Sequence, residues 1–297
     1  MLELSIIIVN YNSQKYLINC LQSIYQNTKD ISFEVIVVDN ASSDDSAAIV
    51  AREFPKSQVI KNDHNLGFIK GNNIGLRLAK GKYLLSLNND TEIKDNALKI
   101  LVDFMDSHPE AGACGAKLLN SNGTIQHQCK RGFPTPWNIC TYSLGLSKLF
   151  PKSKLFGGYL MAYLGPNKIN EIDAISGACF MVRKEIADRV GIMDEDYIMY
   201  GDDLDWSYRI KQAGWKIYYV PEAEIIHYGG RGGSSIHRHR NIIEFHRSMF
   251  TFYNKHYKKK YPFFITWLVY AGIGFKCVKK LLMYKLRKEK HVGSKKP

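Results

Sequence analysis

The chain has 297 residues, of which 45% are hydrophobic and 23% charged, enough for one large folded domain or two small ones. This composition excludes a chain that is disordered throughout. The net charge of +13 is local, because residues 255–297 hold thirteen Lys or Arg and one acid. Residues 1–254 hold the other 28 bases and 27 acids, so the basic tail needs its own explanation.

The chain start, MLELSIIIVNY, has no basic segment of the kind that opens a signal peptide, and we expect a strand and a cytoplasmic origin. No stretch approaches the ~20 apolar residues of a transmembrane helix. The six cysteines are scattered and form no C-x-x-C pair. This argues against a zinc site or a disulfide framework and favours reduced thiols in the core.

Apolar strands alternate with helices from the first residues onward. The pattern predicts strands at 5–9, 33–38, 58–61 and 83–87, and helices at 16–25 and 67–80. Such an alternation is typical of a parallel sheet covered on both faces, in which ligands bind at the carboxyl ends of the strands. These ends carry the polar segments Asn10-Tyr11-Asn12, Asp39-Asn40 and Asn88-Asn89-Asp90. Each alone is a plain turn, but three at one edge indicate a ligand crevice.

The common nucleotide motifs are absent, both the P-loop and the dinucleotide fingerprint. Six other segments carry a resemblance. In chain order they are SIIIVNYNSQKYL, VIVVDNASSDDS, NLGFIKGNNIGL, LLSLNNDTEI, SGACFMVRKE and YGDDLDWSYRIKQAGW. Together they resemble the inverting family-2 glycosyltransferases, and within them the rhamnosyltransferase-like branch of cell-surface polysaccharide synthesis. The resemblance covers about residues 5–256, with a gap around 130–170. It implies the α/β GT-A fold, a mainly parallel central sheet flanked by helices.

The resemblance implies a nucleoside-diphosphate sugar donor, dTDP- or UDP-linked. It places the family's base-reading carboxylate at Asp39, whose alternative role is to cap a turn. Asn10 and Tyr11 would flank the same nucleotide, or form a turn. Further candidate donor contacts are Asn72 and Asn73 on the glycine-rich helix, Asn89 after the fourth strand, and Arg231 in the loop 229–235. This loop would close over the diphosphate, or it is a flexible surface loop. The glycines around Asn72 are equally compatible with a helix packed tightly on the sheet.

The family's metal-binding D-x-D motif falls on Asn88-Asn89-Asp90, where only the last carboxylate is kept. We therefore expect Mg²⁺ or Mn²⁺ to arrive mostly with the nucleotide, held by Asp90. His227, at the end of another apolar strand, matches a third metal ligand of related enzymes, although a lone His is more often structural.

The family's Glu-Asp pair, whose second acid is the general base, falls on Asp202-Asp203 before an amphipathic helix. By this resemblance Asp203 deprotonates the acceptor hydroxyl, and Asp202 supports it with a side chain one methylene shorter than Glu. Acids at a helix N-terminus are also favoured by the helix dipole alone.

Two absences narrow the expected activity. The Q-x-x-R-W signature of processive synthases is missing, so we expect one sugar per encounter, and there is no multi-span membrane domain. We expect the acceptor to be a glycan or a lipid-linked oligosaccharide, and we expect residues 133–170 and 176–180 to recognise it. Two alternatives stay open: transfer to a polyprenyl phosphate, and a catalytically silent protein that binds nucleotide sugars or acts as a membrane scaffold.

We divide the chain into a GT-A domain, 1–256, and a basic, aromatic-rich tail, 257–297. The tail opens with YPFFITWLVYAGIGF, an apolar run too short to span a membrane but suited to an interfacial helix. Lysines on both sides would meet anionic lipids, which places the protein peripherally on the inner face of the cell membrane. The alternative is a helix that packs on the enzyme or forms a dimer. Lysines that flank an apolar helix argue against nucleic acid as the partner.

Overall fold

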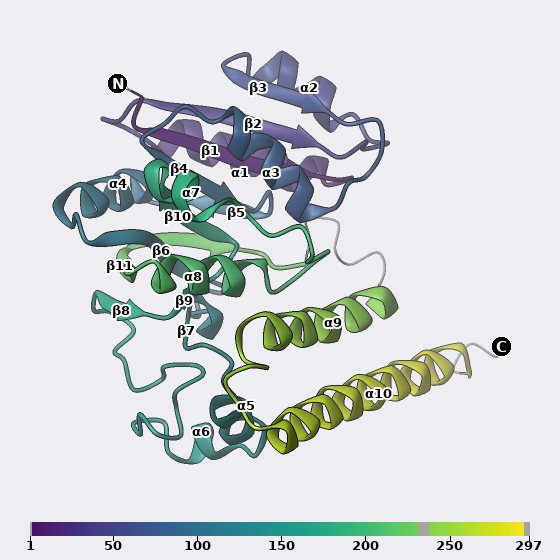
Figure 1. Cartoon of the computed structure of the whole chain (residues 1–297). Helices are drawn as coiled ribbons and strands as arrows, with labels where there is room; N and C mark the ends of the chain where they lie inside the picture. Colours follow the sequence, from purple (N-terminus) through teal and green to yellow (C-terminus); the bar gives the residue numbers. More distant parts are fainter. Residues whose placement is uncertain (1, 231–237, 294–297) are drawn as a thin grey trace. The chain divides into compact units, whose positions relative to one another are not determined.

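The computed structural model describes residues 2–230 and 238–293, so the predicted donor contact Arg231 lies outside the described residues (Figure 1). The chain forms two compact units. The first comprises residues 1–195 and 202–233, and the second comprises 196–201 and 234–297. The predicted division into a GT-A domain, 1–256, and a membrane-associating tail, 257–297, follows the expected activity of each part and not the compact units. It stays a prediction.

The first unit is built on a sheet of nine strands. In spatial order they are β3 (Ser57–Lys61), β2 (Phe33–Asp39), β1 (Leu4–Asn10), β4 (Tyr83–Leu87), β10 (Cys179–Arg183), β6 (Ala111–Leu119), β11 (Lys216–His227) and β5 (Thr91–Ile93), with β8 (Asn170–Ile172) also paired to β11. β10 is antiparallel to both of its neighbours, and β5 and β8 are antiparallel to β11. The other strands share one direction, which confirms the expected mainly parallel α/β sheet.

Buried strands form the centre of this sheet. Every residue of β1, β4 and β10 is buried, as expected of strands covered on both faces. The covering helices are α1 (Gln14–Asn27), α2 (Ser46–Glu53), α3 (Phe68–Leu78), α4 (Ala97–Ser107), α7 (Lys184–Val190) and α8 (Asp202–Gln212) (Figure 1). The predicted strands and helices of the first ninety residues are thus confirmed to within a few residues.

The glycines of α3 allow the helix to lie close to β1. A Cβ atom on Gly75 would lie 2.4 Å from Cγ2 of Ile7, and one on Gly71 would lie 2.9 Å from Cγ1 of Val9. No side chain fits at either position without displacing the strand. The tight-packing interpretation of these glycines therefore accounts for them.

Residues 120–172 form a less regular part of the first unit. It contains a 3-10 turn (His127–Cys129), β7 (Lys130–Arg131), α5 (Pro136–Ser143) and α6 (Leu146–Leu149). β7 pairs with β9 (Ala174–Ile175) in a small second sheet, which ties this region to the segment before β10. Several large apolar side chains are exposed here, among them Trp137 and Phe150.

The second unit contains α9 (Arg238–His256) and α10 (Phe263–Gly293). Aromatic side chains pack between the two helices. The rings of Phe250 and Tyr270 lie 4.7 Å apart, and the Tyr270 hydroxyl donates to Oδ1 of Asn254 at 2.5 Å. The predicted apolar run is the first half of a single helix of 31 residues. Among the described residues, no helix combines the length and apolarity needed to cross a membrane.

The cysteines are all free. Cys20, Cys114, Cys129 and Cys179 are buried, and burial raises the pKa of each of these thiols, which makes them unreactive. Cys140 is exposed and Cys277 is half-buried, so the expectation of core thiols holds for four of the six.

Candidate active site

Polar side chains at the ends of β1, β2 and β4 form one buried network. Nδ2 of Asn10 lies 3.1 Å from Oδ1 of Asp39 and donates to Oγ of Ser46 at 2.8 Å. Nδ2 of Asn89 donates to Oδ1 of Asn10 at 2.9 Å. The three predicted polar segments therefore do meet at one edge of the sheet.

Asp39 is 4% exposed and stabilises the turn that follows β2. Its Oδ2 accepts the backbone N–H of Ser42 at 3.0 Å, and its Oδ1 accepts the Ser42 hydroxyl at 2.6 Å. Oδ1 also faces Asn10, so its two lone pairs are occupied, whereas these contacts leave one lone pair on Oδ2. The turn-capping role is present, and the free lone pair is compatible with one additional N–H donor. Tyr11 follows Asn10, half-buried.

Asn72 and Asn73 are both 1% exposed and are used within the protein. Asn72 donates to the carbonyl of Phe68 and accepts the Ser86 hydroxyl at 2.9 Å. Asn73 donates to the carbonyl of Met193 and to Glu195, both at 2.9 Å. These contacts tie α3 to the sheet and to the segment before 196, which supports a structural role.

Asp90 and His227 come together from the ends of β4 and β11. Nε2 of His227 lies 3.3 Å from Oδ1 of Asp90, and the backbone N–H of Tyr228 donates to the carbonyl of Asp90 at 2.9 Å. The Asp90 side chain is 3% exposed. The structure therefore pairs the two predicted metal ligands although they are 137 residues apart in the sequence.

Gln126 fixes which nitrogen of His227 carries the proton. Nε2 of Gln126 donates to two carbonyl oxygens, that of His227 at 2.7 Å and that of the Asn120 side chain at 3.0 Å. This orients Oε1 of Gln126 toward Nδ1 of His227 at 2.9 Å, so Nδ1 donates. With the proton on Nδ1, Nε2 accepts from Nδ2 of Asn88 at 3.2 Å and lies 3.3 Å from Oδ1 of Asp90, so a metal ion bound to this nitrogen would take the place of the Asn88 contact. Sequence reasoning missed Gln126.

The residues present fit a divalent cation that arrives with its own ligands. A carboxylate oxygen and an imidazole nitrogen face one point, and the buried Oδ1 of the neighbouring Asn88 has no hydrogen-bond partner. In the described part of the chain, no cluster of three or more His, Cys, Asp or Glu could hold a metal alone. Substrate oxygens and water would have to complete the shell, as is usual for Mg²⁺.

Asp202 and Asp203 are the first residues of α8, rather than residues before it. Oδ2 of Asp203 accepts the backbone N–H of Gly177 at 3.0 Å and a hydrogen bond from Nη2 of Arg131. Oδ1 accepts the backbone N–H of Leu204 at 2.8 Å. Burial and the charge of Asp203 raise the pKa of Asp202 to about 7, against the opposing effect of Arg131.

Residues 177–178 connect the two halves of the site. The carbonyl of Ala178 accepts the backbone N–H of Asn88 at 3.1 Å, and the neighbouring Gly177 donates to Asp203. The proposed base and the Asp90–His227 pair are therefore joined through one peptide segment. This segment belongs to the 176–180 stretch that the sequence marks as acceptor-facing.

Comparison with known proteins identifies the family. The family model described as glycosyl transferase family 2 matches residues 5–191. An N-acetylglucosaminyl-diphospho-decaprenol L-rhamnosyltransferase of Mycobacterium tuberculosis is 25% identical over 238 residues, 76% of each chain. The rhamnosyltransferase WbbL of Escherichia coli is 26% identical over 240 residues, 75% of this chain and 82% of its own.

Solved structures share the fold. GalNAc-T7 with UDP, GalNAc and Mn²⁺ superimposes with a TM-score of 0.57 at 20% identity, over 76% of this chain and 44% of its own. A mannosyltransferase from Pyrobaculum calidifontis with GDP-Man and Mn²⁺ gives 0.55 at 18% identity, over 83% and 62%. These GT-A neighbours confirm the predicted fold. Since the family model spans well over half of the chain, and since the motifs it covers form the edge described above, the chain belongs to glycosyl transferase family 2.

Proposed function

We propose that this enzyme transfers one sugar from a dTDP- or UDP-linked donor, such as a rhamnose donor, to a glycan or lipid-linked oligosaccharide, with inversion. The juxtaposition of the Asp90–His227 pair with Asp203 across residues 177–178 carries the proposal. Rhamnosyltransferases among its relatives support the donor class, and the mycobacterial relative, named for a decaprenol-linked substrate, supports the acceptor class.

Three groups of residues have distinct tasks in this proposal. The edge formed by Asn10, Asp39 and Asn89 binds the nucleotide, with the remaining lone pair of Asp39 accepting an N–H of the base. Asp90 and His227 would hold Mg²⁺ or Mn²⁺, which would supply positive charge to the diphosphate leaving group. Asp203 takes the proton of the acceptor hydroxyl as that oxygen attacks the anomeric carbon from the opposite face. A single displacement of this kind inverts the anomeric centre.

Transfer assays with a panel of nucleotide sugars test the proposal. We expect turnover of one donor onto a lipid-linked acceptor, with the opposite anomeric configuration in the product by NMR. Transfer to polyprenyl phosphate would favour the first alternative, because an acceptor that is already ionised has less need of Asp203. Donor binding without any turnover would favour the silent binding protein.

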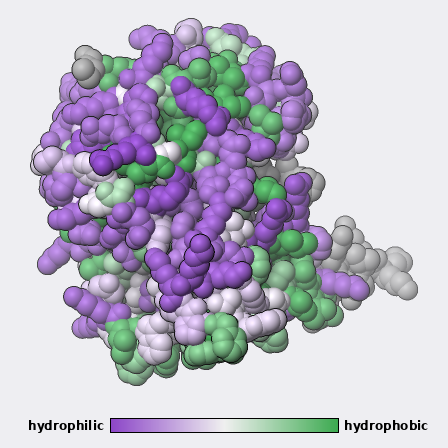
Figure 2. Space-filling model, in the orientation of Figure 1, coloured by the Kyte–Doolittle hydropathy of each residue, from purple (hydrophilic) through white to green (hydrophobic). Residues whose placement is uncertain are grey.

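We propose further that α10 binds the surface of an anionic membrane, and the exposed side chains of the second unit support this. Figure 2 shows hydrophobic side chains gathered over α10. Nine large apolar residues of this helix are between 46% and 78% exposed. They are Phe263, Phe264, Trp267, Leu268, Phe275, Val278, Leu282, Met283 and Leu286. An apolar surface of this extent marks an interaction site.

The spacing of these side chains fits a helix that lies in the membrane plane. Six of them, at positions 264, 268, 275, 278, 282 and 286, recur together with the exposed Ala271 every three or four residues, so they line one face. Exposed Lys279 lies close to that face, and Lys258, Lys259 and Lys260 precede the helix. Each lysine near an anionic surface contributes ~1 kcal/mol. This charge complementarity favours lipid over a second copy of the equally basic chain.

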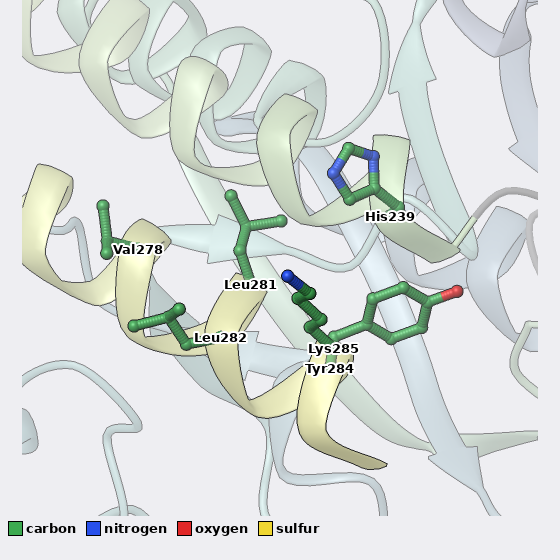
Figure 3. Close-up of a pocket in the computed structure, with 6 residues that line it drawn as sticks. All are labelled: His239, Val278, Leu281, Leu282, Tyr284 and Lys285. Carbon is green, nitrogen blue, oxygen red and sulfur yellow. The ribbon is translucent and has the colours of Figure 1, made fainter. Parts of the chain in front are cut away.

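A pocket of about 480 Å³ lies between α9 and α10 (Figure 3). It is lined by His239 of α9 and by Val278, Leu281, Leu282, Tyr284 and Lys285 of α10. Figure 3 shows Leu281 and Lys285 pointing from α10 toward α9. Val278 and Leu282 belong both to this pocket and to the exposed face, so the apolar surface continues into the pocket.

A further inference from the structure

Arg131 is a nearly buried cation beside the proposed base, and it takes no part in the roles described so far. Its side chain is 12% exposed and extends from the two-residue strand β7. Nη2 donates to Oδ2 of Asp203 and, at 2.8 Å, to the carbonyl of Ile175. One nitrogen therefore links the base to β9.

The hydrogen bonds of Asp203 leave one atom to react. Oδ2 accepts from both Arg131 and Gly177, which uses its two lone pairs, whereas Oδ1 accepts only from Leu204 among the hydrogen bonds described. A proton from an acceptor hydroxyl would therefore go to Oδ1. Without Arg131 the carboxylate could rotate and exchange the two oxygens.

Several carboxylates lie near the Arg131 guanidinium, so a positive charge is favoured at this position. Asp202 is adjacent and 5% exposed, and Asp205 adds a further negative charge on the same helix. Tyr159 interacts with both Arg131 and Asp203, and burial raises the pKa of its hydroxyl. Arg131 is thus the cation that faces the acidic start of α8, since Arg209 is engaged with Asp205 one turn further on.

We propose that Arg131 is a positioning residue for the reaction: it fixes the Asp203 carboxylate so that Oδ1 faces the acceptor. This inference rests on the proposed role of Asp203 as the base. It assigns a mechanistic role to a residue from the irregular 120–172 region, outside the six recognised segments.

The test compares Arg131→Met and Arg131→Lys with a matched control. We expect Arg131→Met to lower kcat at least ~10-fold at pH 7, with donor Kd within twofold of the parent. Arg131→Lys restores the charge without the planar fork, so kcat should recover only in part and stay severalfold below that of the parent.

Arg209→Met is the control, because Arg209 pairs with the buried Asp205 on the same helix and also donates to three carbonyl oxygens. It should lower Tm without lowering kcat. An Arg131→Met variant that folds and keeps the parental kcat overturns the inference. If Arg131→Met does not fold, a parental kcat in Arg131→Lys overturns it. Full activity of Asp203→Asn would instead refute the proposed base itself, so the two failures are distinguishable.

Discussion

The central sheet of the first unit and helix α10 of the second unit differ in how far their apolar side chains are buried. In the first, β1, β4 and β10 are wholly buried, and the polar groups at the strand ends bond to one another. In the second, one side of α10 packs on α9 through aromatic rings while the other exposes nine large apolar residues. The sheet of the first unit is thus covered on both faces, although Leu144, Leu149 and Leu155 of the irregular 120–172 region are exposed, whereas α10 carries a continuous apolar face that we propose binds a membrane surface.

The largest expected effect concerns the base. Asp203→Asn keeps the shape of the side chain but cannot take up the acceptor proton. Transfer should fall at least ~10²-fold with donor binding and Tm preserved, as measured by initial rates, calorimetry and thermal melts. Turnover near that of the parent would contradict the assignment.

The second prediction concerns the metal pair. Asp90→Ala removes the carboxylate that faces Nε2 of His227, so metal-dependent donor binding should be lost, and EDTA should have the same effect on the parent protein. Gln126→Leu should weaken it by about 10- to 100-fold, because it frees the ring without removing a ligand. Full activity in EDTA would refute a metal role.

The third prediction tests the exposed face. Phe264→Ser, Trp267→Ser and Leu268→Ser combined should reduce flotation with anionic vesicles at least ~10-fold, because burying each large side chain contributes ~1.5–3 kcal/mol. The matched control replaces Leu144, Leu149 and Leu155, exposed residues of the first unit, with Ser. High salt should weaken binding of the parent without abolishing it. If the α10 variant instead loses a dimer seen by light scattering, the face binds a second copy.

The fourth prediction compares how closely α3 and α10 pack against neighbouring atoms at one glycine in each helix. Gly75→Ala places a methyl group within 2.4 Å of Ile7 and should cost ~1–3 kcal/mol, several degrees of Tm. In α10, Gly272→Ala meets no atom within 4 Å and should stabilise the helix by up to ~1 kcal/mol. Equal effects at both positions would remove the contrast in packing.

The last expected effect is a pH dependence of stability. Because folding raises the pKa of Asp202 to about 7, the folded state keeps a proton that the unfolded chain loses near pH 4. The stabilising effect of that proton is complete below pH 4 and declines as the pH rises to about 7. Asp202→Asn should therefore raise Tm by a few degrees at pH 8 and leave it unchanged at pH 4. A constant difference across this range would contradict the shift.

Much of the fold could be read from the sequence, because buried parallel strands are short continuous apolar runs with polar ends. Asn10, Asp39 and Asp90 could be placed at one edge for that reason. Gln126 and Arg131 could not, since they lie in a region without periodicity and act across 101 and 72 residues of sequence. The sequence predicts a shorter helix than α10, because Lys276, Lys279 and Lys280 end the apolar run while the helix continues.

Residues 196–201 have a consequence for how such an enzyme can change in evolution. Lys255 of α9 bonds to Asp196 at 2.6 Å, the ring of Phe245 lies 5.7 Å from that of Tyr200, and Gly201 packs beside Ser248. The next residue is Asp202, where α8 begins. The second unit thus holds the peptide that leads directly into the acidic pair. Exchanging α9 and α10 between relatives would require matching changes at 196–201, so the two units are expected to be inherited together rather than as interchangeable modules.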